Sequence, residues 1–232
     1  DSFLHYNDDS LSFLKKGAIL DLDIVNDGKA VSFYNITNKS IIEKKDSGYF
    51  IESAAGDVRL TNFIGRISDN KYIVHECDSS VLEETINEIV ASYGYSKMIY
   101  GSGLNLNLDK INASQKICFD KPIEELRSDV FHSEFSIVHA EYGVSSHGVA
   151  LLKSSQAQPR MLSLAPNLCI VLLKKDRVKN SLASALNALK ADQNGKLPSN
   201  ILFIAGPSRT ADIELITVFG VHGSQKAHLI LY

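Results

Sequence analysis

Long apolar runs are missing from this sequence. None of its apolar segments approaches the roughly 20 residues that a helix needs to cross a bilayer, so we expect no membrane partner. The opening stretch, DSFLHYNDDS, is acidic and polar and lacks the basic start of a secretory signal peptide. We therefore expect a cytoplasmic protein, while the missing initiator methionine leaves open that an upstream segment was removed.

An excess of positive charge is missing as well. The chain carries 24 Lys and Arg residues against 27 Asp and Glu residues, which gives a formal net charge of −3. Proteins that bind nucleic acid or anionic membranes broadly are usually basic, at least on one face. The composition therefore predicts that nucleic acid is not a partner.

Cysteine is scarce and scattered. Cys77, Cys118 and Cys169 are far apart, and none forms a CxxC pair of the kind that holds an iron–sulfur cluster or a structural zinc ion. The histidines show no HxH or HExxH spacing either, so we expect no metal and no cofactor in this chain. Isolated cysteines suit a reducing compartment, and we interpret all three as small buried apolar side chains.

Strand-like and helix-like patterns alternate from about residue 57 onward. Because the 232 residues can bury one sizeable core, this alternation predicts an α/β domain with a mostly parallel sheet and helices on both faces. LCIVLL and ILFIA are apolar throughout, which is typical of strands covered on both faces. The expected strands are 71–76, 97–101, 116–120, 135–140, 148–153, 167–175, 200–206 and 227–232, and the expected helices are 81–94, 177–192 and 210–220.

The first 56 residues follow a different pattern. The stretch IVNDGKAVSFY places Asn26-Asp27-Gly28 between segments rich in β-forming residues, which favours a hairpin. We predict that residues 1–56 form an N-terminal extension, partly a β-hairpin, that packs on the core domain of residues 57–232.

The stretch GPSRTADIE, residues 206–214, connects one apolar run to the next. A glycine turn followed by Ser and Thr caps and two early carboxylates would start a helix well, so one interpretation is structural. The other is an anion site, because a helix N-terminus presents free backbone N–H groups to which hydroxyls and a guanidinium add donors. The residues concerned are Gly206, Pro207, Ser208, Arg209, Thr210 and Asp212.

A histidine follows the same segment. His222 lies between two glycines in GVHG, residues 220–223, and could reach the same end of the sheet as the GPSRT turn. Paired glycines usually mark a tight turn, so a purely structural histidine is the alternative. The loop Gly101-Ser102-Gly103 could line the same sheet edge, and its GSG pattern is weaker evidence for a site. We expect His132 and His139 to be structural.

Three blocks together carry a resemblance to a known family. GPSRTADIE with GVHG, the block RMLSLAP (160–166) before an apolar strand, and AEYGVSSHGV (140–149) resemble the LUD-domain family, in particular its lactate utilisation protein C type. The match in order and spacing covers roughly residues 57–232. The resemblance implies a fold similar to the NagB/RpiA/CoA-transferase-like proteins. It also implies a bacterial role in oxidising L-lactate to pyruvate with iron–sulfur partner proteins.

The resemblance adds candidate site residues, and this chain departs from the family pattern at one place. Arg160 and Ser163 belong to the second block and would face the GPSRT turn at the carboxyl ends of the strands, where both arginines would hold an anionic small molecule. The family usually has an acidic residue, then Ser or Thr, then Gly, whereas this chain has Ser146 and His147 before Gly148. Glu141 is retained. The candidates for a catalytic group are therefore His222, His147 and Glu141.

The sequence leaves two classes of function open. In one, the chain is a lactate-utilisation protein that assembles with iron–sulfur proteins, and replacement of the family's acidic residue by Ser146 favours this accessory role. In the other, it is a small-molecule enzyme of CoA-transferase-like type that binds a CoA ester, a nucleotide or a phosphorylated metabolite, and the retained arginines favour that one.

Overall fold

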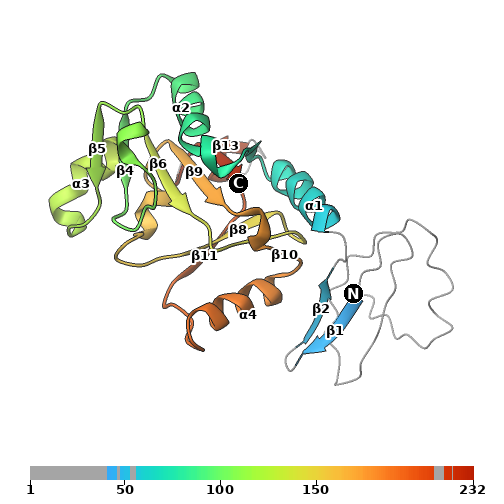
Figure 1. Cartoon of the computed structure of the whole chain (residues 1–232). Helices are drawn as coiled ribbons and strands as arrows, with labels where there is room; N and C mark the ends of the chain where they lie inside the picture. The colour runs from blue at the N-terminus through green and yellow to red at the C-terminus, as the bar shows by residue number, and fades with distance from the viewer. Residues whose placement is uncertain (1–40, 46–47, 53–55, 212–216, 221) are drawn as a thin grey trace, which may run out of the picture.

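A parallel six-stranded sheet forms the centre of the computed structural model, which describes residues 41–45, 48–52, 56–211, 217–220 and 222–232. All five pairings in this sheet are parallel, so the predicted α/β class with a parallel sheet is confirmed (Figure 1). In spatial order the strands are β3 (Ile73–Glu76), β14 (Lys226–Leu231), β9 (Leu168–Leu173), β6 (Phe135–His139), β4 (Lys97–Tyr100) and β5 (Gln115–Cys118).

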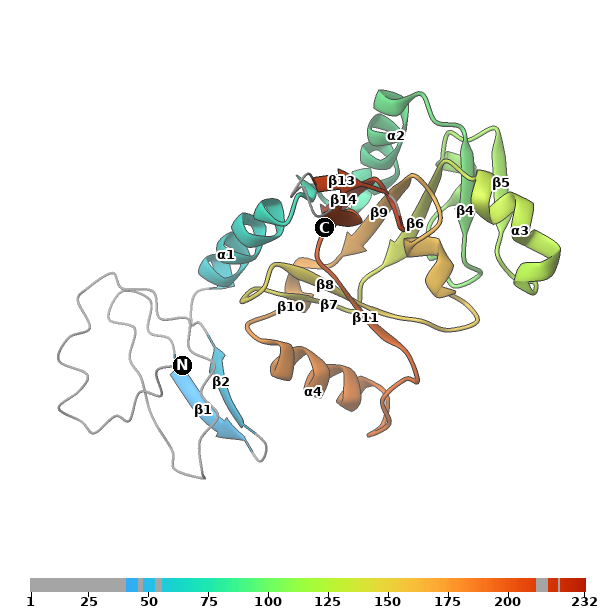
Figure 2. The same cartoon turned by 180° about the vertical axis from the view of Figure 1, so that it is seen from behind.

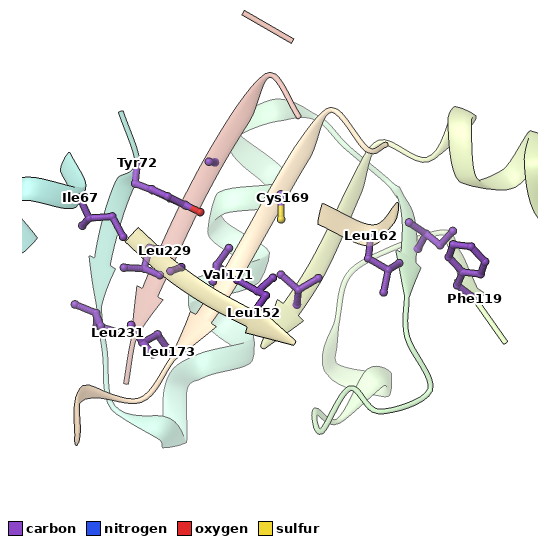
Figure 3. Packing of buried hydrophobic residues seen from close by; sticks show 14 of the residues in the cluster. Ile67, Tyr72, Phe119, Leu152, Leu162, Cys169, Val171, Leu173, Leu229 and Leu231 are labelled. Atoms are coloured by element: carbon purple, nitrogen blue, oxygen red, sulfur yellow. The ribbon is translucent and has the colours of Figure 1, made fainter. Parts of the chain in front are cut away.

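The central strand β9 shows how the sheet divides the core. All six of its residues are buried, as the unbroken apolar run LCIVLL predicts. Because side chains alternate along a strand, Cys169 and Val171 contribute to one cluster and Leu168 and Ile170 to another. Figure 3 shows the first cluster, in which residues of β9 and β14 meet side chains from the segments that cover this face.

Helices cover both faces of the parallel sheet, as predicted. Helix α2 (Leu82–Tyr93) buries four apolar side chains in one cluster, and Gly94 caps it with a left-handed φ of 68°. Helices α1 (Gly56–Asp69) and α3 (Ile123–His132), which were not among the expected helices, pack on the opposite face. None of the helices in the described part of the chain is long and apolar enough to cross a membrane.

A second, four-stranded sheet was not expected. Its order is β10 (Val178–Lys179), β7 (Tyr142–Val144), β8 (Val149–Lys153) and β11 (Ile201–Ile204), with antiparallel pairs on both sides of β8. Ala150 and Leu152 of β8 face the parallel sheet, whereas Leu151 faces helix α4 (Leu182–Asp192). Figures 1 and 2 show α4 on the far side of this small sheet.

Two expectations fail within this second sheet. The predicted helix over 177–192 begins at Leu182 because Val178–Lys179 pair with β7, and a capping box between Ser181 and Ser184 fixes the helix start. The run ILFIA was expected to be covered on both faces. Strand β11 instead lies at the edge of the small sheet, and Phe203 is 39% exposed.

The predicted helix over 210–220 is wrong. The structure has two short antiparallel strands there, β12 (Arg209–Ala211) and β13 (Thr217–Phe219). Thr, Val and Phe in β13 are strand formers, and a short apolar run reads equally well as either element. Asp212 lies outside the described residues.

At the N-terminus, β1 (Ile41–Lys45) and β2 (Gly48–Glu52) form an antiparallel pair. The predicted turn at Asn26-Asp27-Gly28 lies outside the described residues, and packing of residues 1–56 on the core stays a prediction. The described part of the chain also contains short 3-10 turns at Ser79–Val81, Leu108–Lys110, Arg160–Ser163 and Lys175–Arg177.

Candidate functional site

The GPSRT turn lies against the end of the parallel sheet where β3, β14 and β9 begin, which we call the amino edge. Gly206 has a φ of 89°, a conformation that glycine adopts without strain. A Cβ atom at this position would overlap the backbone oxygen of Asn70, which closely precedes β3. Both the positive φ and the close packing therefore require glycine at this position.

Ser208 ties this turn to the start of β14. Its backbone N–H donates to the carbonyl of Ser224 at 2.9 Å, and its own carbonyl accepts from the N–H of Gly220 at 2.9 Å. Two residues after Ser224, β14 begins with Lys226, whose N–H donates to the carbonyl of Asn167, just before β9. The turn therefore sits at the amino ends of β9 and β14.

Ser163 belongs to the same cluster. The buried hydroxyl of Ser224 donates to the carbonyl of Ser163 at 3.3 Å, and the hydroxyl of Ser163 donates to the carbonyl of Arg160 at 2.9 Å. The hydroxyl of Ser136 in β6 donates to the carbonyl of Leu162 and anchors the same 3-10 turn. The structure thus brings together the two sequence blocks, RMLSLAP and GPSRT, that were expected to face each other.

The candidate binding side chains at this edge are solvent-accessible. Arg209 is exposed and donates from Nη2 to the carbonyl of Ala205 at 2.9 Å. Arg160 and His222 are exposed as well, and Thr210 is half-buried. Pro207 is buried in the turn.

Two features of the expected site are wrong. The site was placed at the carboxyl ends of the strands, but the GPSRT turn lies at the amino edge. No helix N-terminus is present at the turn, because Arg209–Ala211 form a strand, and the N–H of Ser208 is already bonded to Ser224. A bound anion here would depend mainly on side chains.

His147 also lies close to the amino edge. Asn70 donates from Nδ2 to the carbonyls of His147 and Gly148, both at 2.8 Å, while its own carbonyl packs against Gly206. The exposed His147 ring places Nδ1 2.7 Å from the hydroxyl of Ser146.

Glu141, in contrast, lies at the opposite end of the parallel sheet, the carboxyl edge, where β4, β6 and β9 end. It follows β6 and forms an ion pair with Lys153 at 3.0 Å, with both side chains 25% exposed. The three candidates for a catalytic group therefore do not meet in one site: Glu141 is at the carboxyl edge, and His147 and His222 are near the amino edge.

The carboxyl edge gathers polar groups that the sequence did not single out. The N–H of His139 donates to Oε1 of Gln158 at 2.8 Å, and its carbonyl accepts from Nε2 of Gln158 at 3.0 Å. The ring of His139 accepts from the N–H of Asn105 at 3.4 Å. Burial lowers the pKa of His139; the carboxylate of Glu141 opposes this shift and the ammonium of Lys174 adds to it.

The sequence held a partial signal for this cluster. His139 directly follows the apolar part of β6, and Gly101-Ser102-Gly103 directly follows β4. The sequence could not show that β4 and β6 are neighbours, because β5 lies between them along the chain. That adjacency is what turns two isolated features into one cluster.

A third polar cluster lies on the face covered by α2. His75 Nε2 and His228 Nδ1 lie 2.8 Å apart, and the other ring nitrogen of His228 lies 2.8 Å from the hydroxyl of Tyr93. His228 is 3% exposed, and burial, with smaller effects of His75 and Lys226, lowers its pKa to about 4. The ammonium of Lys226 lies over the Tyr93 ring at 3.9 Å, which closes the cluster.

The cysteines do not converge. Cys169 is buried in β9, and Cys77 and Cys118 are half-buried, so the interpretation as buried apolar side chains holds fully for Cys169 alone. Burial raises the pKa of Cys169 to about 12, so this thiol is unreactive at neutral pH. Within the described residues, no group of three or more His, Cys, Asp and Glu side chains is placed to hold a metal ion.

Comparisons with known proteins agree with the core of this fold. A crystal structure of a DUF162 family protein from Deinococcus radiodurans superposes with a TM-score of 0.58 at 15% identity. The superposition covers 76% of this chain and 98% of that one, and it shows a shared fold.

Sequence relatives point to one family. The chain is 40% identical over 102 residues to Uncharacterized protein YkgG of Escherichia coli, covering 43% of this chain and 44% of that protein. It is 28% identical over 166 residues to Lactate utilization protein C of Shouchella clausii, covering 67% and 71%. The matched segment thus spans less than half the length of the Escherichia coli relative. Because the model of the LUD domain matches residues 60–232, the chain belongs to the LUD-domain family.

Proposed function

We propose that this protein serves in bacterial lactate utilisation, acting with iron–sulfur partner proteins in the oxidation of L-lactate to pyruvate. The observation that carries the proposal is the LUD-domain match over residues 60–232, together with relatives named Lactate utilization protein C. The separated cysteines favour partners as the carriers of the iron–sulfur clusters.

Within this role, the amino edge binds an anionic group through its side chains. A guanidinium has five N–H donors, and the bond from Arg209 to Ala205 engages one of its nitrogens, so further donors can face a ligand. Arg160 is exposed and begins the 3-10 turn Arg160–Ser163. The hydrogen bond from Ser224 to the carbonyl of Ser163 holds this turn at the same edge. Arginine guanidinium groups and hydroxyls arranged in this way suit a phosphate group, so we choose phosphate compounds as the test ligands.

A thermal-shift experiment tests the amino-edge site. Inorganic phosphate and coenzyme A are added to the purified chain, to Arg209→Ala and to Arg127→Ala, which removes an exposed arginine on α3. A ligand at about 100 times its dissociation constant adds roughly 2.7 kcal/mol, which raises the midpoint by about 5–10 °C in a chain of this size. We expect the shift in the wild type and in Arg127→Ala and its loss in Arg209→Ala. An equal shift in all three would show that the anion binds elsewhere.

The lactate role has a separate test. Disruption of the gene should abolish growth on L-lactate as the sole carbon source and leave growth on glucose unchanged. Co-expression with the iron–sulfur partners should yield a complex that absorbs visible light, whereas this chain alone should be colourless. Normal growth of the disrupted strain on L-lactate would refute the role without bearing on the anion site.

The second candidate is a small-molecule enzyme of CoA-transferase-like type. The observation that favours it is the carboxyl edge, where Glu141 and a histidine with a lowered pKa lie together on rigid strand ends. A stabilising shift with acyl-CoA that is lost in Glu141→Gln, and that does not need Arg209, would support this candidate over the first.

A further inference from the structure

Strand β3 (Ile73–Glu76) is the outermost strand of the parallel sheet on the side of β14. It pairs with β14 on its inner side, and no strand in the described part of the chain pairs with its outer side. A strand edge with free backbone groups is a template for pairing with another strand. The outer side of β3 is therefore a candidate interaction surface.

The backbone of β3 has free groups on this outer side. In a parallel pair, the N–H and C=O of one residue point to the same side, and those of the next residue point to the other. The N–H of Cys77 donates to the carbonyl of Leu231 at 3.0 Å, so the alternation turns the backbone groups of Val74 and Glu76 away from β14. No hydrogen bond to another described residue engages these four groups.

The side chains along this edge do not protect it. An edge strand that stays in solvent is usually blunted by proline, a bulge or charged side chains. The segment Ile73–Val74–His75 contains no proline, lysine or carboxylate. Ile73 is 50% exposed, and Val81, in the turn that follows β3, is 38% exposed. Exposed apolar side chains beside free backbone groups favour an interface with another protein chain.

The charges at the two ends of β3 identify the kind of partner. Lys71 precedes the strand, whereas Glu76 and Asp78 lie at its other end, and all three are exposed. Lys71 and Asp78 form no ion pair with a described residue, and Glu76 lies 3.8 Å from Lys175. When two identical strands of this kind pair antiparallel, the basic end of each meets the acidic end of the other. The edge is therefore complementary to itself.

We propose that β3 pairs antiparallel with β3 of a second copy of this chain, which joins the two parallel sheets into one continuous sheet. Val74 of each copy lies opposite Glu76 of the other, because this register uses all the free backbone groups. A register with Val74 opposite Val74 would need the N–H of Tyr72, which already donates to the carbonyl of Ile67 at 3.2 Å. The dimer depends neither on the lactate role nor on the anion site at the amino edge.

Sedimentation velocity over a range of concentrations tests the proposal. We expect the mass to rise reversibly from that of one copy to that of two between about 1 and 100 μM, since a small edge-to-edge interface gives a modest affinity. Glu76→Pro removes an outward N–H and leaves the bonds to β14 intact, so this variant should stay monomeric throughout. Glu76→Ala, which keeps the N–H, should weaken the dimer less.

The opposite edge of the sheet offers a matched control. The N–H of Phe119 donates to the carbonyl of Tyr100 at 2.7 Å, so the alternation along β5 turns the N–H of Lys116 away from β4. Lys116→Pro thus removes an outward N–H from the other edge strand, and it should dimerise like the wild type. Circular dichroism of dilute samples checks that each proline variant is folded.

Charge variants leave the backbone of β3 unchanged, so they decide the matter even if Glu76→Pro does not fold. Lys71→Glu should weaken the dimer about tenfold, because two exposed ion pairs become repulsive, and Asp78→Lys should do the same. The double variant should restore the wild-type affinity. A wild type that is monomeric at every concentration, an equal loss in Lys116→Pro, or no recovery in the double variant would each overturn the proposal.

Discussion

The two edges of the parallel sheet differ in what their polar groups contact. At the amino edge, Ser208, Ser224 and Asn70 bond mainly to backbone groups of neighbouring segments. At the carboxyl edge, His139, Glu141, Lys153 and Lys174 place titratable side chains beside one another. The recognisable sequence motif therefore lies where it holds neighbouring segments together, and the cluster of His139 and Glu141 lies at the opposite edge.

This contrast has a physical reason. Backbone N–H and C=O groups just before and after a strand are not hydrogen-bonded to the neighbouring strands and need other partners. A turn packed against them must therefore supply hydrogen-bond donors and acceptors. Small and hydroxyl-bearing residues such as those of GPSRT meet that need. A motif rich in donors can thus be structural, and the contrast predicts that variants of Gly206 and Ser208 mainly lower stability, whereas Arg209→Ala mainly affects anion binding.

The largest expected effect is at Gly206. Gly206→Ala should lower the free energy of unfolding by about 3–4 kcal/mol, because it combines a positive φ with overlap of the Asn70 oxygen. Gly195→Ala is the matched control, with a φ of 84° and no atom near its Cβ position, and should cost about 1–2 kcal/mol. Urea unfolding measures both. Equal losses would mean that the contact with Asn70 contributes nothing.

The next effect is a pH dependence near the amino end of β14. The folded state holds the pKa of His228 at about 4, below its unfolded value of about 6.5, so the unfolded state binds the proton first as the pH falls. This group should therefore cost up to about 3 kcal/mol of stability as the pH falls from about 6.5 to 4, and contribute no further loss below 4.

Urea unfolding at several pH values checks this expectation. His228→Asn should show a shallower loss of stability in that window, whereas His132→Asn, on the exposed side of α3, should match the wild type. Hydrogen exchange should show β3 and β14 opening in acid before β4 and β6. The same pH slope in His228→Asn as in the wild type would assign the loss to other groups.

A smaller effect is expected at the carboxyl edge. Gln158→Ala removes both bonds to the backbone of His139 and should cost about 1–2 kcal/mol. Gln156→Ala, two residues earlier and exposed, controls for the loop itself. Equal losses in Gln158→Ala and Gln156→Ala in urea unfolding would mean that the two bonds to His139 contribute little.

The smallest effect is expected for the ion pair between Lys153 and Glu141. The pair is partly exposed, so Lys153→Met should change the free energy of unfolding by about 0.5 kcal/mol. Thermal unfolding in low and high salt measures it, with Lys190→Met as the control. A loss above about 2 kcal/mol would show that the carboxyl edge also serves mainly for stability, and the contrast between the edges would fail.

The fold class followed from the sequence because periodicity reports burial directly. LCIVLL predicted a strand covered on both faces, and the spacing of Leu82, Ile86, Ile89 and Val90 predicted α2. The four-stranded sheet was missed because the sequence of a strand does not say which sheet it joins. The run TADIELITVFG failed for a related reason, since a short segment of mixed strand and helix formers is decided by its tertiary partners.

The candidate site was predicted less well than the fold. The sequence blocks around Ser163 and Ser208 do meet, as expected, but at the amino edge. Their placement required the strand order, which the sequence does not state. His139 was expected to be structural because an isolated histidine has no spacing to match, and its neighbours Gln158 and Asn105 come from distant loops.

The place of β14 has a consequence for how the chain is made. β14 follows every other strand of the parallel sheet in the sequence, yet it lies between β3 and β9. Its His228 is separated from His75 of β3 by 153 residues, so at roughly 5–20 residues per second a ribosome needs about 8–30 seconds to supply the missing strand. β3 presents an open edge to chaperones or to other nascent chains throughout that interval, and β9 does so once it has been made. A prematurely terminated chain would lack β14 permanently, and its open strand edges would mark it as a target for proteases.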